Sequence, residues 1–262
     1  MSAKIQQPAY VSHERGDRTA PKRSSRTFHS LTQLLRKLRE IVESDLLPPG
    51  DTLVDYGCAN RPYEWLFKTK FKNYQGADLP GNDRADLILG PNGELPCPDN
   101  SVDCVLSSQV LEHVYAPRLY LAEAFRVLRP NGSLVLSTHG VWPYHPDPTD
   151  YWRWTIDGLQ LQIRLAGFEI VAVKGVFGLE SSALQLWQDA TYERLPAVCQ
   201  KPYTWFIQTL IGLIERRQPD KISNDASVYI VLARKTPAVA QMNVADSVAS
   251  EARTISEDVV RS

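Results

Sequence analysis

The 262-residue chain lacks several features that would narrow its class at once. Its four cysteines, Cys58, Cys97, Cys104 and Cys199, include no CxxC pair. Their spacing therefore predicts no zinc site and indicates reduced thiols, as in a cytoplasmic protein. The sequence has no run of 18 or more apolar residues, which predicts no membrane-spanning helix. The formal net charge is −1, so bulk charge favours neither a nucleic acid nor an anionic membrane as a partner.

Both ends of the sequence lack a hydrophobic period. Residues 1–27 contain no apolar core of a signal peptide, and their polar, basic composition predicts a flexible arm. Residues 236–262 are small, polar and patternless, and we expect a disordered tail. Residues 28–235 remain, which is a typical length for one domain.

Inside that domain, apolar runs of strand length alternate with helical patterns. A helix is predicted for 28–47, ended by Pro48-Pro49-Gly50. This alternation predicts an α/β fold with a Rossmann-like, doubly wound, mainly parallel sheet of seven strands and helices on both faces. The predicted strands are 52–57, 73–79, 85–90, 101–109, 133–139, 168–176 and 227–235. Further helices are predicted at 62–70, at 117–132 with Asn131-Gly132 as its end, at 156–167, and as a helical insertion at 180–217 broken near Pro196 and Pro202.

Two acidic residues end the first two predicted strands. Ligands of doubly wound sheets lie beyond the carboxyl ends of the strands, so Asp55 and Asp78 should face one crevice. Asp78 follows Gly57 by 21 positions, close to the usual offset of a carboxylate that accepts hydrogen bonds from ribose hydroxyls. Such a carboxylate would repel a 2′-phosphate, so we expect a nucleoside with a free ribose.

The turn after the first strand lacks two glycines of the dinucleotide fingerprint. After Gly57 the sequence reads Cys58-Ala59-Asn60-Arg61-Pro62, where G-x-G-x-x-G would place two more glycines. The turn therefore suits a ligand without a pyrophosphate, and a nicotinamide-dependent oxidoreductase is disfavoured. Ala59 would be strained if the backbone there needs a positive φ.

Four segments in register resemble the class I S-adenosylmethionine-dependent methyltransferases. The segments are "DYGCA" (55–59), "ELPCPDNSVDCVLSSQVLEHV" (94–114), "AEAFRVLRPNG" (122–132) and "SLVLST" (133–138), and Arg61-Pro62-Tyr63 is similar to the "CGxxPY" loop of one subgroup. The resemblance implies S-adenosyl-L-methionine as the cofactor. It also implies a set of cofactor-binding residues: Asp55, Tyr56, Gly57, Cys58, Ala59, Asn60, Asp78, Leu79, Asn92, Gly93, Glu94, Ser107, Ser108 and Gln109.

Methyl transfer to a hydroxyl needs a group that removes the hydroxyl proton. His139 ends the fifth predicted strand and is the first candidate for that base. Glu112 and His113 are expected to hold a loop by hydrogen bonds. His139, His145, Asp147 and Asp150 match no standard metal-ligand spacing, so no metal site is predicted.

The loop at 139–160 is rich in aromatic side chains and is predicted to bind the substrate. Flat rings and polar groups suit a sugar or another flat polar acceptor, and the loop resembles segments of methyltransferases associated with glycan assembly. The predicted substrate-binding residues are His139, Trp142, Tyr144, His145, Tyr151, Trp152 and Arg153.

Three questions stay open at this level. The chain could be a non-catalytic relative that binds a partner through its aromatic loop. The apolar segment 205–214 could belong to the core, to a homodimer face or to a peripheral membrane contact, and the first two are favoured. A nucleic-acid methyltransferase is disfavoured, because "SSQV" (107–110) stands where an N/D-P-P-Y/F motif would be and no basic stripe is present.

Overall fold

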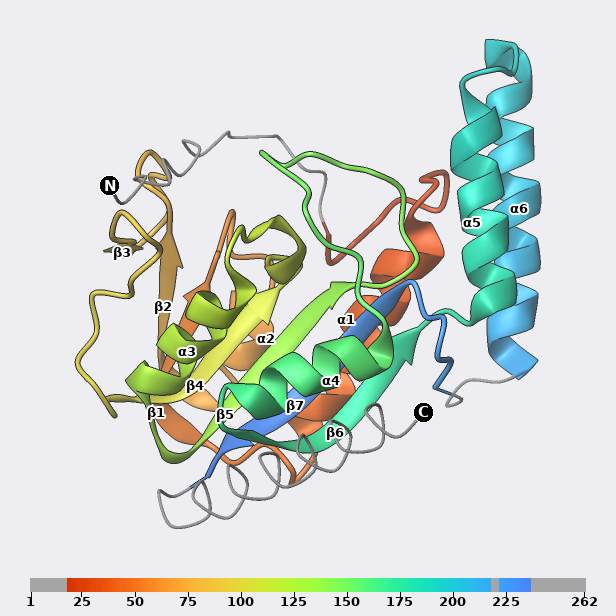
Figure 1. Ribbon diagram of the computed structural model, residues 1–262. Helices are drawn as coiled ribbons and strands as arrows, with labels where there is room; N and C mark the ends of the chain where they lie inside the picture. Colours follow the sequence, from red (N-terminus) through yellow and green to blue (C-terminus); the bar gives the residue numbers. More distant parts are fainter. Residues whose placement is uncertain (1–17, 218–221, 237–262) are drawn as a thin grey trace, which may run out of the picture.

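A single seven-stranded sheet forms the centre of the molecule (Figure 1). The computed structural model describes residues 18–217 and 222–236; the first part of the expected arm and nearly all of the expected tail lie outside these ranges. The strand order is β3-β2-β1-β4-β5-β7-β6, with β7 antiparallel to both of its neighbours and the other pairs parallel. The predicted fold class is confirmed. The strands are β1 (Gly50–Tyr56), β2 (Phe71–Asp78), β3 (Leu87–Ile88), β4 (Val102–Ser108), β5 (Leu128–His139), β6 (Phe168–Val176) and β7 (Val228–Lys235).

Helices cover both faces of the sheet because side chains alternate along each strand. Val54 of β1 packs in one core cluster with α3 and α4, whereas the preceding Leu53 packs in a second cluster with α1, α2 and α6. Figure 1 shows α3 and α4 in front of the sheet and α1 and α2 behind it. The helices are α1 (Phe28–Glu43), α2 (Glu64–Phe67), the 3₁₀ helix η1 (Leu111–His113), α3 (Pro117–Val127), α4 (Ile156–Leu165), α5 (Leu179–Tyr192) and α6 (Ala197–Arg217).

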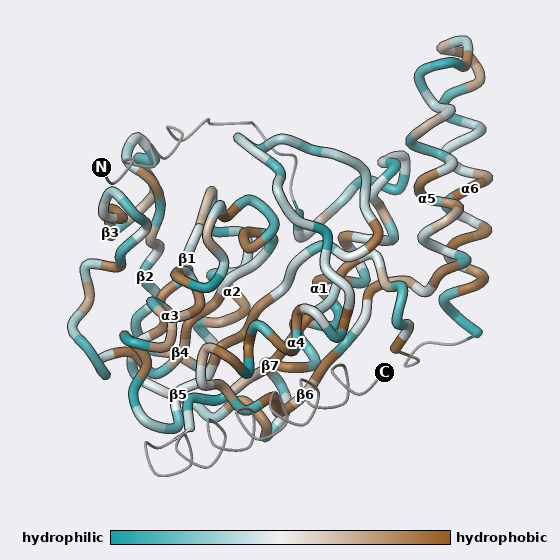
Figure 2. The backbone as a smooth tube through the Cα atoms, in the orientation of Figure 1, coloured by the Kyte–Doolittle hydropathy of each residue, from teal (hydrophilic) through white to brown (hydrophobic). Residues whose placement is uncertain are grey.

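Helices α5 and α6 form a hairpin that projects away from the sheet (Figure 1). Its inner side is polar: the Gln208 amide donates to the side-chain oxygens of Gln185, at 3.2 Å, and Gln188, at 2.9 Å. Its outer side is apolar, with Trp187 61% and Trp205 69% exposed. Figure 2 shows hydrophobic positions recurring along both helices. The core interpretation of segment 205–214 is therefore wrong for Trp205.

Several predicted helix ends were wrong. The helix predicted to end at Asn131-Gly132 ends at Val127, because Leu128 already pairs with Val102 of β4. Asn131, with φ 65°, instead lies within β5, whose pairing with β4 shifts register between Val102 and Cys104. Helix α1 ends at Glu43 rather than at 47, α2 has only four residues, and α6 continues through Pro202.

Candidate active site

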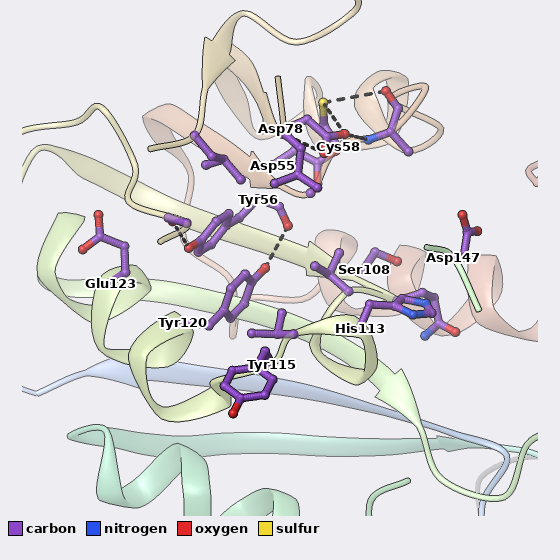
Figure 3. Close-up of a pocket in the computed structure, with 18 of the residues that line it drawn as sticks. Asp55, Tyr56, Cys58, Asp78, Ser108, His113, Tyr115, Tyr120, Glu123 and Asp147 are labelled. Carbon is purple, nitrogen blue, oxygen red and sulfur yellow. Dashed lines mark hydrogen bonds between the residues drawn. The ribbon is translucent and has the colours of Figure 1, made fainter. Parts of the chain in front are cut away.

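A cavity of about 620 Å³ opens at the carboxyl ends of β1, β2 and β4. The strand order reverses between β1 and β4, which is where doubly wound sheets bind ligands. Figure 3 shows Asp55, Cys58 and Asp78 grouped on one side of the cavity and His113 on the other. The volume lies within the range of small-molecule sites.

Asp55 is the last acidic residue of β1 and lies almost fully buried in the cavity wall. The Tyr74 hydroxyl of β2 donates a hydrogen bond to its carboxylate. Burial raises the pKa of Asp55 to about 7, the hydrogen bond from Tyr74 lowers it, and the nearby charge of Asp78 raises it. A cationic group bound beside Asp55 would therefore lower the pKa of this carboxyl and favour its ionised form.

In the turn after β1, three of the five residues 57–61 have a left-handed backbone conformation. Gly57 has φ 87°, and a Cβ there would lie 2.6 Å from the Val110 side chain, so glycine is required. Ala59 (φ 46°) and Arg61 (φ 57°) also lie in the left-handed region. The backbone therefore keeps a conformation that favours glycine although two of its positions hold other residues.

Hydrogen bonds around Asp78 hold this strained turn. The Ala59 backbone N–H donates to Asp78 Oδ2 at 2.8 Å, and the Asn82 amide donates to the same oxygen at 2.7 Å. Asn82 also donates to the Ala59 carbonyl at 2.9 Å, and the Leu79 N–H donates to Asp78 Oδ1 at 2.8 Å. The Cys58 thiol also donates weakly to Oδ2, at 3.9 Å, so the capacity left for a further donor lies on Oδ1, which accepts only from Leu79.

The structure brings together nearly all of the residues predicted to bind the cofactor. Ser107 is the exception: it is fully buried behind the wall, with Tyr120 Oη 2.8 Å from its hydroxyl, so its predicted place was wrong. The predicted residues that line the cavity are Asp55, Tyr56, Gly57, Cys58, Ala59, Asn60, Asp78, Leu79, Asn92, Gly93, Glu94, Ser108 and Gln109.

Helix α3 and the segment before it supply a wall that sequence reasoning missed. Tyr115, Leu119, Tyr120 and Glu123 line the cavity, and Tyr120 stacks on Tyr56 with ring centroids 3.9 Å apart. Within α3, Glu123 follows Tyr120 by three positions and Leu119 by four, a spacing that marks one helix face but does not tell what that face covers. Arg18, in the expected arm, also lines the cavity, so the arm contributes to the site.

A second cavity of about 610 Å³ adjoins the first. The two share Arg18, Gln109, His113 and Asp147 as lining residues. The predicted base His139 lines only the second, together with Trp142 and His145 of the aromatic loop. The two cavities thus have a common wall, so ligands bound in both would lie next to each other.

His139 and Glu112 form a buried pair beside the second cavity. His139 Nε2 lies 3.4 Å from Glu112 Oε1, and the imidazole stacks on Trp142 at 4.7 Å. Burial raises the pKa of Glu112 to about 7, and burial lowers the pKa of His139 well below its usual range. Both groups are therefore biased toward their neutral forms in the surroundings described.

Glu112 and His113 hold the aromatic loop, as the sequence predicted. The backbone N–H groups of Tyr151 and Trp152 donate to the Glu112 carbonyl at 2.9 and 3.1 Å, and the His113 ring hydrogen-bonds the Thr149 carbonyl. These bonds fix an otherwise irregular segment of 16 residues between β5 and α4.

The predicted substrate residues separate into three groups. Tyr151 lines the first cavity, whereas His139, Trp142 and His145 line the second. Tyr144, Trp152 and Arg153 line neither. Arg153 donates instead to the Trp142 and Pro143 carbonyls and to Asp150, so its guanidinium stabilises the loop itself.

Among the described helices, none is both long and apolar enough to cross a membrane.

Comparisons with known proteins match the central part of the chain. Residues 55–136 match the family model Methyltransf_11, described as a methyltransferase domain. A probable S-adenosylmethionine-dependent methyltransferase of Mycolicibacterium smegmatis is 36% identical over 100 residues, which cover 36% of this chain and 39% of the relative. The malonyl-[acyl-carrier protein] O-methyltransferase of Serratia marcescens is 30% identical over 99 residues, 34% of this chain and 39% of the relative. The chain thus matches about two fifths of the length of these relatives.

A solved structure extends the likeness to most of the fold. The crystal structure of the cyclase SpnF superposes with a TM-score of 0.50 at 21% identity, covering 88% of each chain. At this identity the likeness concerns the fold alone. The sequence likeness itself lies in residues 55–136, which are similar to a methyltransferase domain and to probable S-adenosylmethionine-dependent methyltransferases.

Proposed function

We propose that this protein transfers a methyl group from S-adenosyl-L-methionine to an oxygen of a glycan, a glycan precursor or a small molecule. The observation that carries the proposal is the pair of adjoining cavities: predicted cofactor residues line the first, and the N-terminal segment with α1 lines most of the second, to which the aromatic loop adds His139, Trp142 and His145. The names of both curated relatives support methyl transfer, and the Serratia marcescens relative is an O-methyltransferase.

The first cavity would hold the cofactor across the tips of β1, β2 and β4. Asp55 would face the methionine moiety, whose ammonium and sulfonium groups are cationic, and its buried carboxylate would stabilise them. Asp78 would accept one ribose hydroxyl with its last free lone pair. The donors already on Asp78 would keep the carboxylate and the turn in place for that contact.

The acceptor would enter from the second cavity. A sulfonium methyl is already electrophilic, so the protein must align the attacking oxygen and remove its proton where the acceptor is a hydroxyl. His139 lines this cavity and is the proposed base. A carboxylate acceptor, by contrast, would have no proton to lose and would not need His139.

Binding of S-adenosylhomocysteine to two variants tests the proposal. Calorimetry should show micromolar binding to the native protein, no binding to Asp78→Ala, and native affinity in His139→Ala. In a transfer assay, His139→Ala should be slower by about two orders of magnitude with a hydroxyl acceptor. Unchanged affinity in Asp78→Ala would remove Asp78 from the site, and a native rate in His139→Ala would clear that residue of the base role.

The same titration distinguishes the competing functions. Absence of S-adenosylhomocysteine binding would favour a non-catalytic relative, an alternative suggested by Ala59 and Arg61 at positions that favour glycine. Binding of reduced nicotinamide cofactor instead would favour an oxidoreductase. A methyl-transfer screen read by mass, with nucleotide sugars, lipid-linked sugars and small phenols, would then identify the acceptor class.

Location and assembly are also part of the proposal. Free thiols at all four cysteines fit a cytoplasmic protein. The exposed outer face of the α5–α6 hairpin, with Trp187 and Trp205, keeps a homodimer or a peripheral membrane contact as predictions. Analytical ultracentrifugation of the native protein and of Trp205→Glu separates these two, because only a dimer would dissociate on that change in the absence of lipid.

A further inference from the structure

Three side chains capable of binding a metal ion meet where the two cavities share a wall. Glu112 and His113 come from η1, and His145 comes from the aromatic loop. One potential ligand atom from each lies within 4.8 Å of the others. The sequence hides this group, because 32 positions of irregular spacing separate His113 from His145.

Glu112 provides independent evidence for a ligand here, because one of its buried carboxylate oxygens has no hydrogen-bond partner among the described residues. Its side chain is fully buried, and Oε2 accepts a hydrogen bond from the Thr138 hydroxyl at 2.8 Å. Oε1 has no hydrogen-bond partner among the described residues. It points at two imidazoles, with His139 Nε2 at 3.4 Å and His113 Nε2 at 3.9 Å. A buried carboxylate oxygen without a partner is costly, and a cation would remove that cost.

Both histidines of the group are held through their other ring nitrogen. His113 Nδ1 hydrogen-bonds the Thr149 carbonyl. His145 Nδ1 lies 3.1 Å from the Pro143 carbonyl and 3.3 Å from both Asp150 Oδ2 and Arg153 Nη2; the two oxygens can accept its proton, and Arg153 is paired with Asp150. Histidines that coordinate metals nearly always donate their second nitrogen to a carbonyl or carboxylate in this way. We therefore assign Nε2 of each ring as the coordinating atom.

His139 lacks that support and stays outside the ligand set. Its Nδ1 is buried without a hydrogen-bond partner among the described residues. Its Nε2 lies 3.4 Å from Glu112 Oε1, but the group whose ligand atoms all lie within 4.8 Å of one another consists of Glu112, His113 and His145. This leaves His139 as the predicted base and the second cavity as the open side of the site.

We propose that Glu112, His113 and His145 bind a divalent transition-metal ion at the boundary of the two cavities. Two imidazole nitrogens and one carboxylate oxygen suit Zn²⁺ and its first-row neighbours, whereas Mg²⁺ and Ca²⁺ prefer oxygen ligands alone. Ligands about 2.0–2.2 Å from a zinc ion lie roughly 3.4 Å apart. The present separations need only small side-chain movements to reach that value. Two positively charged side chains lie near the three proposed ligands. Arg18 lines both cavities, and Arg153 pairs with Asp150.

Calorimetry with zinc chloride on the full chain, without cofactor, tests the proposal. The native protein should bind one Zn²⁺ per chain at micromolar concentration or below. His113→Ala, His145→Ala and the isosteric Glu112→Gln should each weaken binding at least tenfold. His29→Asn is the matched control, because this histidine lies against Gly212 of α6 and lines neither cavity, and its loss should leave affinity unchanged. Circular dichroism checks that each variant is folded.

Two results would overturn the proposal. One is absence of Zn²⁺ binding to the native protein at about 100 μM metal, and the other is native affinity in the folded His113 and His145 variants. Cobalt substitution gives a second readout, since visible absorption bands should appear in the native protein and be lost in Glu112→Gln. The inference does not rest on methyl transfer: S-adenosylhomocysteine binding is measured separately, so either proposal can fail while the other stands.

Discussion

The two sides of the crevice differ in how completely their polar atoms are partnered. On the β2 side, Asp78, Asn82 and the Ala59 backbone hydrogen-bond one another, and Asp55 accepts from Tyr74. Outside this network, Arg61 Nε and Tyr63 Oη are buried without a hydrogen-bond partner among the described residues. On the η1 side, Glu112 Oε1 and His139 Nδ1 are buried and have no hydrogen-bond partner among the described residues. Both sides are equally deep in the molecule, so burial alone does not explain the difference.

The difference indicates which kind of ligand each side of the crevice binds. A network that is satisfied without a ligand is rigid, and it presents a prepared surface to whatever binds. A side with orphaned buried atoms has a free-energy cost that an occupant can remove. We therefore regard the β2 side as a prebuilt nucleoside site and the η1 side as a site completed by an ion or an acceptor.

Isosteric substitutions of two carboxylates, Asp78 on the β2 side and Glu112 on the η1 side, should show the largest difference in the free energy of unfolding. Asp78→Asn keeps only one oxygen, so its NH2 must face either the Ala59 and Asn82 donors or the Leu79 N–H, which should cost about 1–3 kcal/mol in the free energy of unfolding. Glu112→Gln keeps an oxygen for Thr138 and removes a carboxylate oxygen that has no partner. That change should cost less than about 1 kcal/mol.

Urea unfolding of both variants in the presence of a chelator measures the two costs. The chelator matters, because bound metal would stabilise the native form and enlarge the apparent cost of Glu112→Gln. Equal losses in the two variants would show that the η1 side is as well satisfied as the β2 side, and the comparison would fail.

Asp55 should give the β2 side a distinctive pH dependence. Its pKa is raised to about 7 in the folded protein, against 3.8 for the free group, so between about pH 4 and 7 the folded state binds more protons than the unfolded state. By linkage, this group lowers stability as pH rises through that window and has no further effect above it. Relative to the native protein, Asp55→Asn should gain on the order of 3 kcal/mol between pH 4.5 and 7.5.

Unfolding of both proteins across that pH range isolates the effect, because every other titrating group is common to the pair. Tyr74→Phe is a useful control: removing the hydrogen bond that lowers the pKa of Asp55 should shift the window upward. A stability difference between native and Asp55→Asn that does not change with pH would mean that Asp55 is ionised throughout.

The sequence predicted the residues of the β2 side better than those of the η1 side. Asp55 and Asp78 end short apolar strands, and parallel strands bring their carboxyl ends to one edge, so local pattern was enough to place them together. Glu112, His113 and His145 meet only because the irregular loop at 140–155 folds back onto η1. No periodicity encodes such a path, and the same holds for Arg18 and for the face of α3 that lines the cavity.

One local signal was misleading for a physical reason. Asn131-Gly132 is a common helix end, but here Asn131 adopts its positive φ inside β5, after Leu128 has begun to pair with β4. Turn residues report a backbone conformation, and a helix end and a strand irregularity can require the same one.

The smallest expected effect concerns Ala59, which with Arg61 is one of two non-glycine residues of this turn in the left-handed region. Ala59→Gly removes the steric cost of φ 46° but makes the unfolded chain more flexible, so the net gain in stability should be only about 0.5–1 kcal/mol. Arg61→Gly is the matched control. It relieves a similar φ of 57° but removes the ion pairs of Arg61 with Asp86 at 2.9 Å and Glu64 at 3.2 Å, and its hydrogen bond to the Tyr74 carbonyl at 3.0 Å, so it should not stabilise the protein. If Ala59→Gly instead destabilised the protein or weakened S-adenosylhomocysteine binding, the alanine methyl would be making a favourable contact. Alanine would then serve the ligand site better than glycine at this position.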